Sequence, residues 1–193
     1  MDPITCRKIE WRGPFSWPDY EKENGLPALP LEKGVYLQAF EYSGGYLIYA
    51  AGLTRRYFHT RFKEHTRSYL NGEYNILDVP SATSGIRKEH WHGWEYARNN
   101  RDEFEELRSA LTPKINYQLC NFRIFVANLG AEPRIHERIE SSIMNVLYTQ
   151  LPPVAELPDR GMFLSKRKPT EQAIILENSC HSILWGLPRH LEI

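Results

Sequence analysis

The pattern of apolar and polar residues predicts two strands joined by a short turn in the first third of the chain. GVYLQAFEY (34–42) and YLIYAAG (46–52) are rich in aromatic and aliphatic residues, and a Ser-Gly-Gly sequence separates them. Two such runs around a glycine turn are typical of a β-hairpin.

Helical spacing follows the second strand. Apolar side chains recur at three- and four-residue steps over about 55–70, which predicts an amphipathic helix that Asn71-Gly72 ends. A second amphipathic helix is predicted over 134–151, where Pro133 is a favourable first residue. Its apolar side consists of Ile139, Ile143, Val146 and Leu147.

The other segments carry weaker patterns. Residues 1–33 contain several aromatic residues and are punctuated by Pro14, Pro18, Pro27 and Pro30, so we expect an irregular arm whose aromatic side chains pack onto the domain. A charged surface helix is expected over 101–111 and a third strand over the alternating segment 116–129. The last helical pattern lies near 171–185.

This order of elements predicts an α+β fold with a small antiparallel or mixed β-sheet flanked by helices. We expect one core domain over 34–150, preceded by the arm and followed by a C-terminal extension, 151–193, packed on the same domain. Residues 73–118 form an insertion between the first helix and the third strand, long enough to hold elements that recognise a substrate.

Composition narrows the class of protein. Among 193 residues, 24 Lys and Arg balance 24 Asp and Glu, so a nucleic-acid partner would require a local basic patch. Three widely spaced cysteines argue against a disulfide framework or a zinc knuckle and favour a reducing compartment. The chain begins without an apolar leader and holds no apolar run of membrane-spanning length, so we expect a soluble, cytoplasmic protein.

Several polar residues stand where they could share a site. The hairpin places Tyr36 near the start of one strand and Tyr49 near the end of the next, so the two phenols can approach each other. Arg61 and His65 are four residues apart and share one face of the helix. Glu140 lies beside the apolar side of the later helix and is the preferred carboxylate for such a site. Glu137, three residues earlier, is the alternative.

A cluster of positive charge surrounds Arg61. Within 55–67 five basic residues face a single acidic one, Glu64, on a chain without net charge. Such a stripe is what contact with phosphates requires, so we expect it to bind nucleic acid. Besides Arg61, its members are Arg55, Arg56, Lys63 and Arg67.

The ordered set of these motifs resembles the GIY-YIG nuclease superfamily. The matching pieces are Gly34-Val35-Tyr36, Ile48-Tyr49-Ala50-Ala51-Gly52, Arg61-Phe62-Lys63-Glu64-His65 and Glu140-Ser141-Ser142-Ile143-Met144. They occur in the order of that family's signature, and the resemblance covers roughly residues 34–150. Two departures stand out: Tyr-Ala-Ala-Gly is one residue longer than Tyr-Ile-Gly, and the Asn that many members carry after the Glu helix has only Asp159 as its candidate here.

The resemblance implies hydrolysis of a phosphodiester bond with one divalent metal ion. Glu140 would bind Mg²⁺, or Mn²⁺, and Arg61 would contact the scissile phosphate. Tyr49 would position water or phosphate, and either Tyr36 or His65 would be the general base. A single carboxylate suits an ion that keeps most of its water shell, as Mg²⁺ prefers.

We therefore expect a Mg²⁺-dependent endonuclease that acts on DNA as a monomer or homodimer. The alternative within the same fold is a catalytically inactive nucleic-acid-binding module. An enzyme of unrelated class would need a motif such as a Gly-rich phosphate loop or a nucleophile elbow, and we find neither. The kind of DNA, whether in restriction, repair or defence, stays open at this stage.

Overall fold

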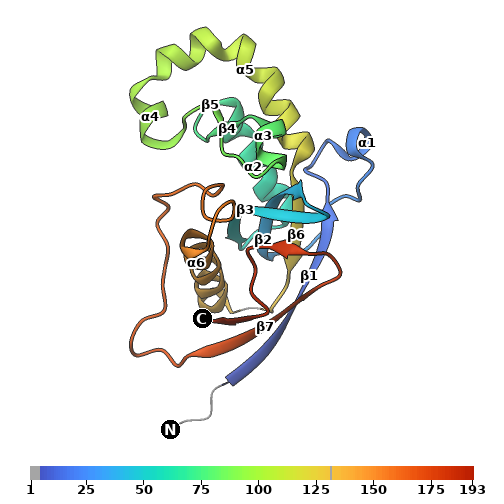
Figure 1. Ribbon diagram of the computed structural model, residues 1–193, viewed down its shortest axis with the longest axis vertical. Helices are drawn as coiled ribbons and strands as arrows, with labels where there is room; N and C mark the ends of the chain where they lie inside the picture. Colours follow the sequence, from blue (N-terminus) through green and yellow to red (C-terminus); the bar gives the residue numbers. More distant parts are fainter. Residues whose placement is uncertain (1–4, 131) are drawn as a thin grey trace.

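A mixed seven-stranded sheet forms the centre of the protein in a computed structural model that describes residues 5–130 and 132–193 (Figure 1). The strand order is β8-β3-β2-β6-β1-β7-β9, and β4 and β5 form a separate two-stranded sheet. The strands are β1 (Thr5–Phe15), β2 (Gly34–Tyr42), β3 (Gly45–Thr54), β4 (Ile76–Leu77), β5 (Glu89–Trp91), β6 (Arg123–Ala127), β7 (Ile174–Cys180), β8 (Leu184–Trp185) and β9 (His190–Glu192).

Helices flank the sheet and extend beyond one end of it. They are α1 (Glu21–Asn24), α2 (Phe58–Leu70), α3 (Val79–Thr83), α4 (Trp94–Asn99), α5 (Arg101–Asn121) and α6 (Pro133–Thr149). Figure 1 shows α4 and α5 at the end of the molecule opposite β7, with α6 beside the sheet. Across 5–130 and 132–193, none of these helices combines the length and apolar character that crossing a membrane requires. The α+β class with a mixed sheet is confirmed, although seven strands make the sheet larger than expected.

The predicted β-hairpin is confirmed. β2 and β3 pair antiparallel from Gly34 opposite Thr54 to Tyr42 opposite Gly45. Both residues of the turn have positive φ, 45° at Ser43 and 72° at Gly44. A two-residue turn with this geometry matches the twist of the strands it joins.

A β-bulge in β3 decides where Tyr49 points. Gln38 pairs with Ala50 and Ala39 pairs with Ile48, so Tyr49 is the residue without a partner. The Tyr49 ring lies 6.1 Å from the ring of Phe40, which is on the same side of β2 as Tyr36. The extra residue of the Tyr-Ala-Ala-Gly motif is therefore taken up by the bulge, and both tyrosines face the same side of the hairpin.

Tyr36 lies across Gly52, its partner on β3. A Cβ atom at Gly52 would stand 2.3 Å from Cζ of the Tyr36 ring. Only glycine leaves room for the ring in this position, and the ring then packs on α2, 4.9 Å from Phe62. The glycine of the second motif thus sets the position of the tyrosine of the first.

The helix α6 covers the free edge of β3. On the side of β3 away from β2, β8 pairs only at Tyr46 and Leu47, so the later part of this edge has no strand beside it among the described residues. The Ala51 N–H donates to Sδ of Met144 at 3.1 Å, and the backbone of Leu53 hydrogen-bonds to Glu140. Side chains of α6 thus satisfy backbone groups that an exposed edge would leave unpaired.

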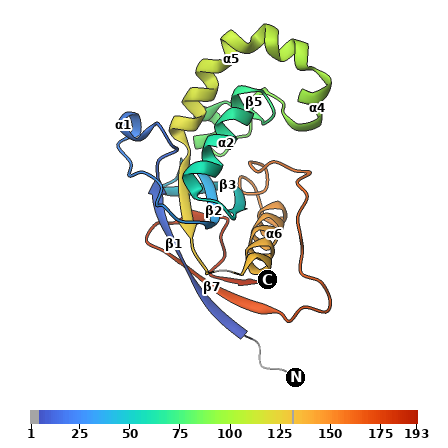
Figure 2. The same ribbon diagram turned by 180° about the vertical axis from the view of Figure 1, so that it is seen from behind.

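The expectation of an irregular N-terminal arm is wrong for Thr5–Phe15. This segment is β1, which lies between β6 and β7 and pairs parallel with β7 (Figure 2). Ile9 and Trp11 are buried at alternate positions while Lys8 and Glu10 are not. The period-two pattern was present in the sequence, but the partner strand lies some 170 residues further along.

The predicted helix near 171–185 is also wrong. The segment forms β7 and β8, and burial alternates in β7 at Ile174, Leu176 and Asn178. β7 completes the sheet by pairing with β1 and β9. The C-terminal segment is therefore part of the same sheet as the hairpin.

The strand expected over 116–129 is confirmed only for Arg123–Ala127. Residues 116–121 form the last turns of α5, which is longer than the helix expected over 101–111. The buried positions Leu111, Ile115, Gln118 and Leu119 follow helical spacing, which the local alternation around Tyr117 concealed. The predicted helices over 55–70 and 134–151 are confirmed as α2 and α6, with small differences at their ends.

We predict that Gly52→Ala destabilises the fold by about 1–3 kcal/mol, because the added methyl group overlaps the Tyr36 ring. Urea unfolding of the variant measures this loss. In a Tyr36→Ala background the same substitution should cost far less, since the ring is absent. Equal costs in both backgrounds would contradict the close approach of Tyr36 to Gly52.

Candidate active site

One cavity of about 210 Å³ brings together the polar residues singled out from the sequence. Its lining includes all five predicted catalytic residues: Tyr36, Tyr49, Arg61, His65 and Glu140. They come from β2, β3, α2 and α6, which are separated by up to a hundred residues in the chain. The insertion adds Tyr74 and Trp94, and the C-terminal segment adds Asp159 and Met162.

Three side chains form a hydrogen-bonded chain on one wall. The Tyr36 hydroxyl lies 2.8 Å from Nε2 of His65, and Nδ1 of His65 lies 3.2 Å from the hydroxyl of Tyr74. A neutral imidazole has one donor and one acceptor nitrogen, so it can accept from one phenol and donate to the other. This arrangement can pass a proton from Tyr36 toward Tyr74.

Burial determines the protonation states of His65 and Tyr36. Desolvation, followed by the nearby positive charge of Arg61, lowers the pKa of His65 to about 3, so the imidazole is neutral. Desolvation raises the pKa of Tyr36 to about 12, although the charge of Arg61 opposes the rise. Tyr36 is thus a phenol that needs a further positive charge before it can act as a base near neutral pH.

Arg61 has an unused hydrogen-bond donor inside the protein. Its Nε is buried and has no hydrogen-bond partner among the residues that the structure describes. The only ion pair of its guanidinium group in this part of the chain is with Glu64, at 3.4 Å. A buried donor without a partner costs about 1–3 kcal/mol, and an anion entering the cavity would remove that cost.

Of the two rival glutamates, Glu140 lines the cavity and Glu137 does not. Burial raises the pKa of Glu140 to about 7, with Glu137 adding to the rise and Arg61 opposing it. Glu137 instead forms ion pairs with Arg55 at 3.0 Å and Arg134 at 3.2 Å, and it does not line the cavity. Glu140 thus lies with the other candidate residues, and its role as a metal ligand stays a prediction.

The cavity suits a divalent cation held through Glu140. A carboxylate oxygen is a preferred ligand of Mg²⁺, and a half-buried one whose ionised form is disfavoured gains most from a nearby cation. Within 5–130 and 132–193, no three His, Cys, Asp or Glu side chains gather as a metal-binding group. A Mg²⁺ ion held through Glu140 would keep several of its waters, as this ion prefers.

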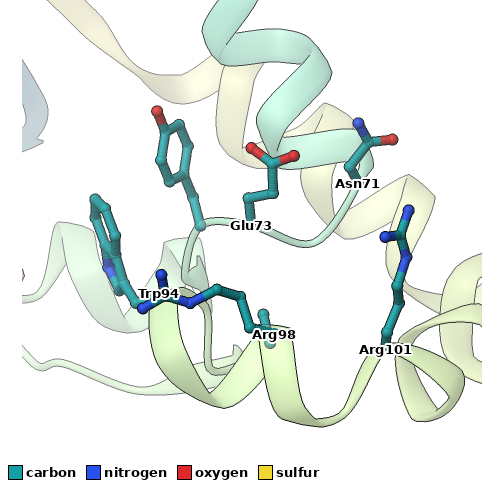
Figure 3. Close-up of a pocket in the computed structure, with 7 residues that line it drawn as sticks. Asn71, Glu73, Trp94, Arg98 and Arg101 are labelled. Atoms are coloured by element: carbon teal, nitrogen blue, oxygen red, sulfur yellow. The ribbon is translucent and has the colours of Figure 1, made fainter.

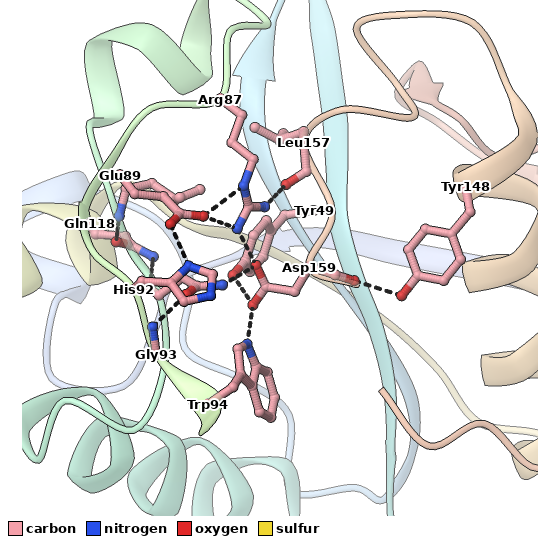
Figure 4. A network of polar contacts seen from close by, with 12 residues as sticks. Tyr49, Arg87, Glu89, His92, Gly93, Trp94, Gln118, Tyr148, Leu157 and Asp159 are labelled. Carbon is pink, nitrogen blue, oxygen red and sulfur yellow. Dashed lines mark hydrogen bonds and ion pairs between the residues drawn. The ribbon is translucent and has the colours of Figure 1, made fainter. Parts of the chain in front are cut away.

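Tyr49 belongs to a second polar network, centred on Asp159 (Figure 4). The buried Asp159 carboxylate accepts hydrogen bonds from Tyr49 at 2.6 Å and from Trp94 at 3.1 Å. Asn75 and Arg87 also donate to it, at 2.6 and 2.7 Å. Because the Tyr49 hydroxyl donates to Asp159 and also hydrogen-bonds to Tyr69, its predicted role in positioning water or phosphate stays a prediction.

The predicted basic stripe does not form one surface. Lys63 follows Arg61 by two residues, roughly 200° around α2, and Arg67 follows it by six, roughly 240° around the helix. Lys63 and Arg67 are exposed, with Asp19 4.0 Å from Lys63. A phosphate that reaches Arg61 would thus lie on the other side of the helix from these two residues.

The two arginines before α2 have acidic neighbours. Arg55 pairs with Glu137 at 3.0 Å and Arg56 pairs with Glu64 at 2.5 Å, in both cases with most of the arginine side chain exposed. Exposed ion pairs of this kind contribute only about 0–1 kcal/mol, so a phosphate could replace the carboxylate. Nucleic-acid binding by Arg55, Arg56, Lys63 and Arg67 stays a prediction.

None of Tyr74, Trp94 and Arg87 was among the site residues predicted from the sequence. All three lie in the insertion, where no motif marks a polar or aromatic residue as part of a site. The only available signal was the position of Tyr74 just after the helix stop at Asn71-Gly72. The C-terminal partner, Asp159, was noted only as a candidate for the family's Asn position.

Comparison of the chain with models of known families, with curated proteins and with solved structures gives no match. The functional interpretation of this cavity therefore depends on its own residues and geometry.

We predict that the free energy of unfolding decreases as the pH falls, because folding holds the buried His65 in its neutral form. His65 has a folded pKa of about 3 and an unfolded pKa near 6.5, so its contribution is present above pH 6.5 and is lost as pH falls toward 3. Between pH 7 and pH 5, wild type should lose about 2 kcal/mol relative to His65→Gln. Urea unfolding across this range measures the difference.

The control for this prediction is His59→Gln. His59 lies on the same helix but is exposed, so its replacement should leave the pH dependence unchanged. Parallel curves for wild type and His65→Gln would show that His65 is not held neutral in the folded protein.

Proposed function

We propose that this protein is a divalent-metal-dependent endonuclease that hydrolyses DNA phosphodiester bonds at a GIY-YIG-type site. The observation that carries the proposal is the convergence of Tyr36, Arg61, His65 and Glu140 on one cavity. The chain lacks net charge, so recognition of DNA would depend on local groups such as these and not on a general positive field.

The resemblance to the GIY-YIG superfamily gains support from two details of the hairpin. Gly52 provides the space that the Tyr36 ring occupies, which gives the glycine of the second motif a physical reason. The bulge at Tyr49 accommodates the additional residue of that motif while keeping both tyrosines on the α2 side. The longer motif is therefore compatible with the family's arrangement of strands.

Arg61 has the properties of a phosphate ligand. Its guanidinium group is half-buried, carries a donor without a partner in the described part of the chain, and lies near the Tyr36 hydroxyl. A phosphoryl oxygen in the cavity would satisfy this donor. Charge that grows on that oxygen in the transition state would then strengthen the contact, which is how such a group accelerates hydrolysis.

Tyr36 is the better candidate for the general base, with His65 holding its hydroxyl in position through a hydrogen bond. The neutral imidazole accepts a hydrogen bond readily, and Nε2 stands 2.8 Å from the phenol oxygen. With the Tyr36 proton released to solvent in the presence of a bound cation, the phenolate oxygen would accept a proton from a water held against it. Tyr74, on the other side of the ring, holds the imidazole in this orientation.

A Mg²⁺ or Mn²⁺ ion held by Glu140 would supply positive charge that activates water and stabilises the leaving oxygen. Glu140 is half-buried with a pKa of about 7, so its proton must leave before an ion binds. Metal affinity should accordingly rise with pH through neutrality. The partner is proposed to be DNA, bound by a monomer or a homodimer.

The first test is cleavage of supercoiled plasmid with Mg²⁺, with and without chelator. We expect Mg²⁺-dependent nicking or linearisation that Glu140→Gln abolishes, because the amide keeps the shape but cannot replace the charge at the metal. Glu137→Gln is the matched control and should retain most of the activity, since Glu137 pairs with arginines outside the cavity. Binding without cleavage by wild type would instead indicate the inactive nucleic-acid-binding module.

The second test separates the two candidate bases. If Tyr36 is the base, Tyr36→Phe should lower the maximal rate by about 10²–10⁴-fold at every pH, with little change in DNA affinity. His65→Gln should be milder, because an amide oxygen can still accept the Tyr36 hydrogen bond. Single-turnover rates at saturating protein measure both. A Tyr36→Phe protein that cuts at the wild-type rate would exclude Tyr36 as the base.

A further inference from the structure

A second pocket of about 430 Å³ adjoins the candidate active site (Figure 3). It lies between the end of α2 and the junction of α4 with α5, and the residues that line it are Asn71, Glu73, Tyr74, Trp94, Ala97, Arg98 and Arg101. Neither the motifs nor the proposed chemistry accounts for it. Most of its lining comes from the insertion, which a minimal nuclease domain does not need.

The pocket combines aromatic surfaces with unpaired polar groups. The rings of Tyr74 and Trp94 lie 5.1 Å apart at 46°, and Trp94 is 38% exposed. Figure 3 shows Arg98 and Arg101 on one side of the space and Glu73 on the other. Arg98 and Arg101 form no ion pair with any residue in the described part of the chain, so their donors are free for a ligand.

This chemistry matches a nucleobase. A base has a π-face that stacks on aromatic side chains, and its edge carries both donors and acceptors. Glu73 and Asn71 offer acceptors, and the two arginines offer donors as well as charge for the attached phosphate. A small anion alone would not need the aromatic wall.

The position of the pocket connects it to the reaction. Tyr74 and Trp94 line both this pocket and the active-site cavity. The Tyr74 hydroxyl also hydrogen-bonds to His65, so the pair of rings formed by Tyr74 and Trp94 is connected to the proposed general base, Tyr36, through His65. A base stacked here would belong to a nucleotide next to the scissile phosphate.

Trp94 is held in place at the boundary between the two pockets. Its backbone has a φ of 58°, which a bulky side chain rarely adopts. The Trp94 N–H donates to the Glu73 carbonyl at 2.8 Å, and the indole N–H donates to Asp159 at 3.1 Å. The ring is therefore fixed in advance, which lowers the entropic cost of stacking a base on it.

We propose that this pocket binds the base of an unpaired nucleotide adjacent to the cleaved bond, and that the enzyme prefers DNA containing such a nucleotide. This inference rests on the proposed nuclease function and names its substrate class. A base within an intact duplex is stacked on both sides and cannot enter, so bulged, mismatched or flipped nucleotides would be favoured.

The experiment uses the full chain with Glu140→Gln, which should bind DNA without cutting it. Two fluorescently labelled duplexes of the same sequence are compared at one salt concentration, one fully paired and one with a single unpaired adenine. Fluorescence anisotropy gives the two affinities. We expect the bulged duplex to bind about 10-fold more tightly, since stacking of one base is worth roughly that factor or more.

Substitutions then locate the preference. Trp94→Ala should abolish it, whereas Trp94→Phe should keep most of it, because phenylalanine retains a stacking face but loses the bond to Asp159. The double variant Arg98→Gln, Arg101→Gln changes only exposed residues. It should weaken binding of the bulged duplex by at least several-fold. Lys8→Gln, an exposed cation on β1 without an ion pair in the described residues, is the charge control and should change neither affinity.

The outcomes separate the two levels of the proposal. Equal affinity for the two duplexes, unaffected by Trp94→Ala, would overturn the nucleobase pocket while Mg²⁺-dependent plasmid cleavage by wild type still stood. Absence of both DNA binding and cleavage would overturn the nuclease function and the pocket together. A preference for the bulged duplex that Trp94→Phe loses as fully as Trp94→Ala would assign Trp94 to the Asp159 network and overturn its stacking role.

Discussion

The buried carboxylate of Asp159 is the constraint on which the arrangement of the cavity depends. A carboxylate in this position is stable only when a cation and several donors compensate for lost water. Arg87 supplies the cation, and Tyr49 and Trp94 supply donors from β3 and from the start of α4. One charged group thereby joins the hairpin, the insertion and the C-terminal segment. Because Tyr148 also donates to its backbone carbonyl at 2.6 Å, α6 is tied to the same point.

The polar groups of the protein divide into two kinds according to whether their hydrogen bonds are satisfied. Asp159 has four donors around its carboxylate, and its role is to hold the walls of the cavity. Arg61 retains a buried donor with no partner among the described residues, and burial disfavours the charged form of Glu140. A buried donor without a partner and a buried carboxylate both lower the stability of the folded protein. Such groups are expected where a bound ligand supplies the missing hydrogen bond or charge. The division favours Arg61 and Glu140 as ligand-binding groups and Tyr49 as a residue that supports them.

The parts of the fold predicted correctly are those that local sequence determines. The hairpin, α2 and α6 each carry their own periodicity and turn signals, and the five candidate residues on them meet in one cavity. β1 and β7 were missed because Thr5 pairs with Ile174, a contact that no window of sequence contains. Tyr74, Trp94 and Arg87 could not be predicted for a similar reason: their positions follow from how the insertion folds back onto Asp159, a charge near the other end of the chain.

The distribution of charge has a consequence for how DNA would be recognised. Lys63 and Arg67 point away from the face that bears Arg61, and Arg55 and Arg56 are paired with carboxylates. Arg98 and Arg101 have no such partners in the described chain, and they border the aromatic wall of the adjoining pocket. Attraction of phosphates by a broad positive face is thus weak here. In the proposed function, discrimination between DNA structures would then depend on what fits the two joined pockets and not on the net charge of the chain.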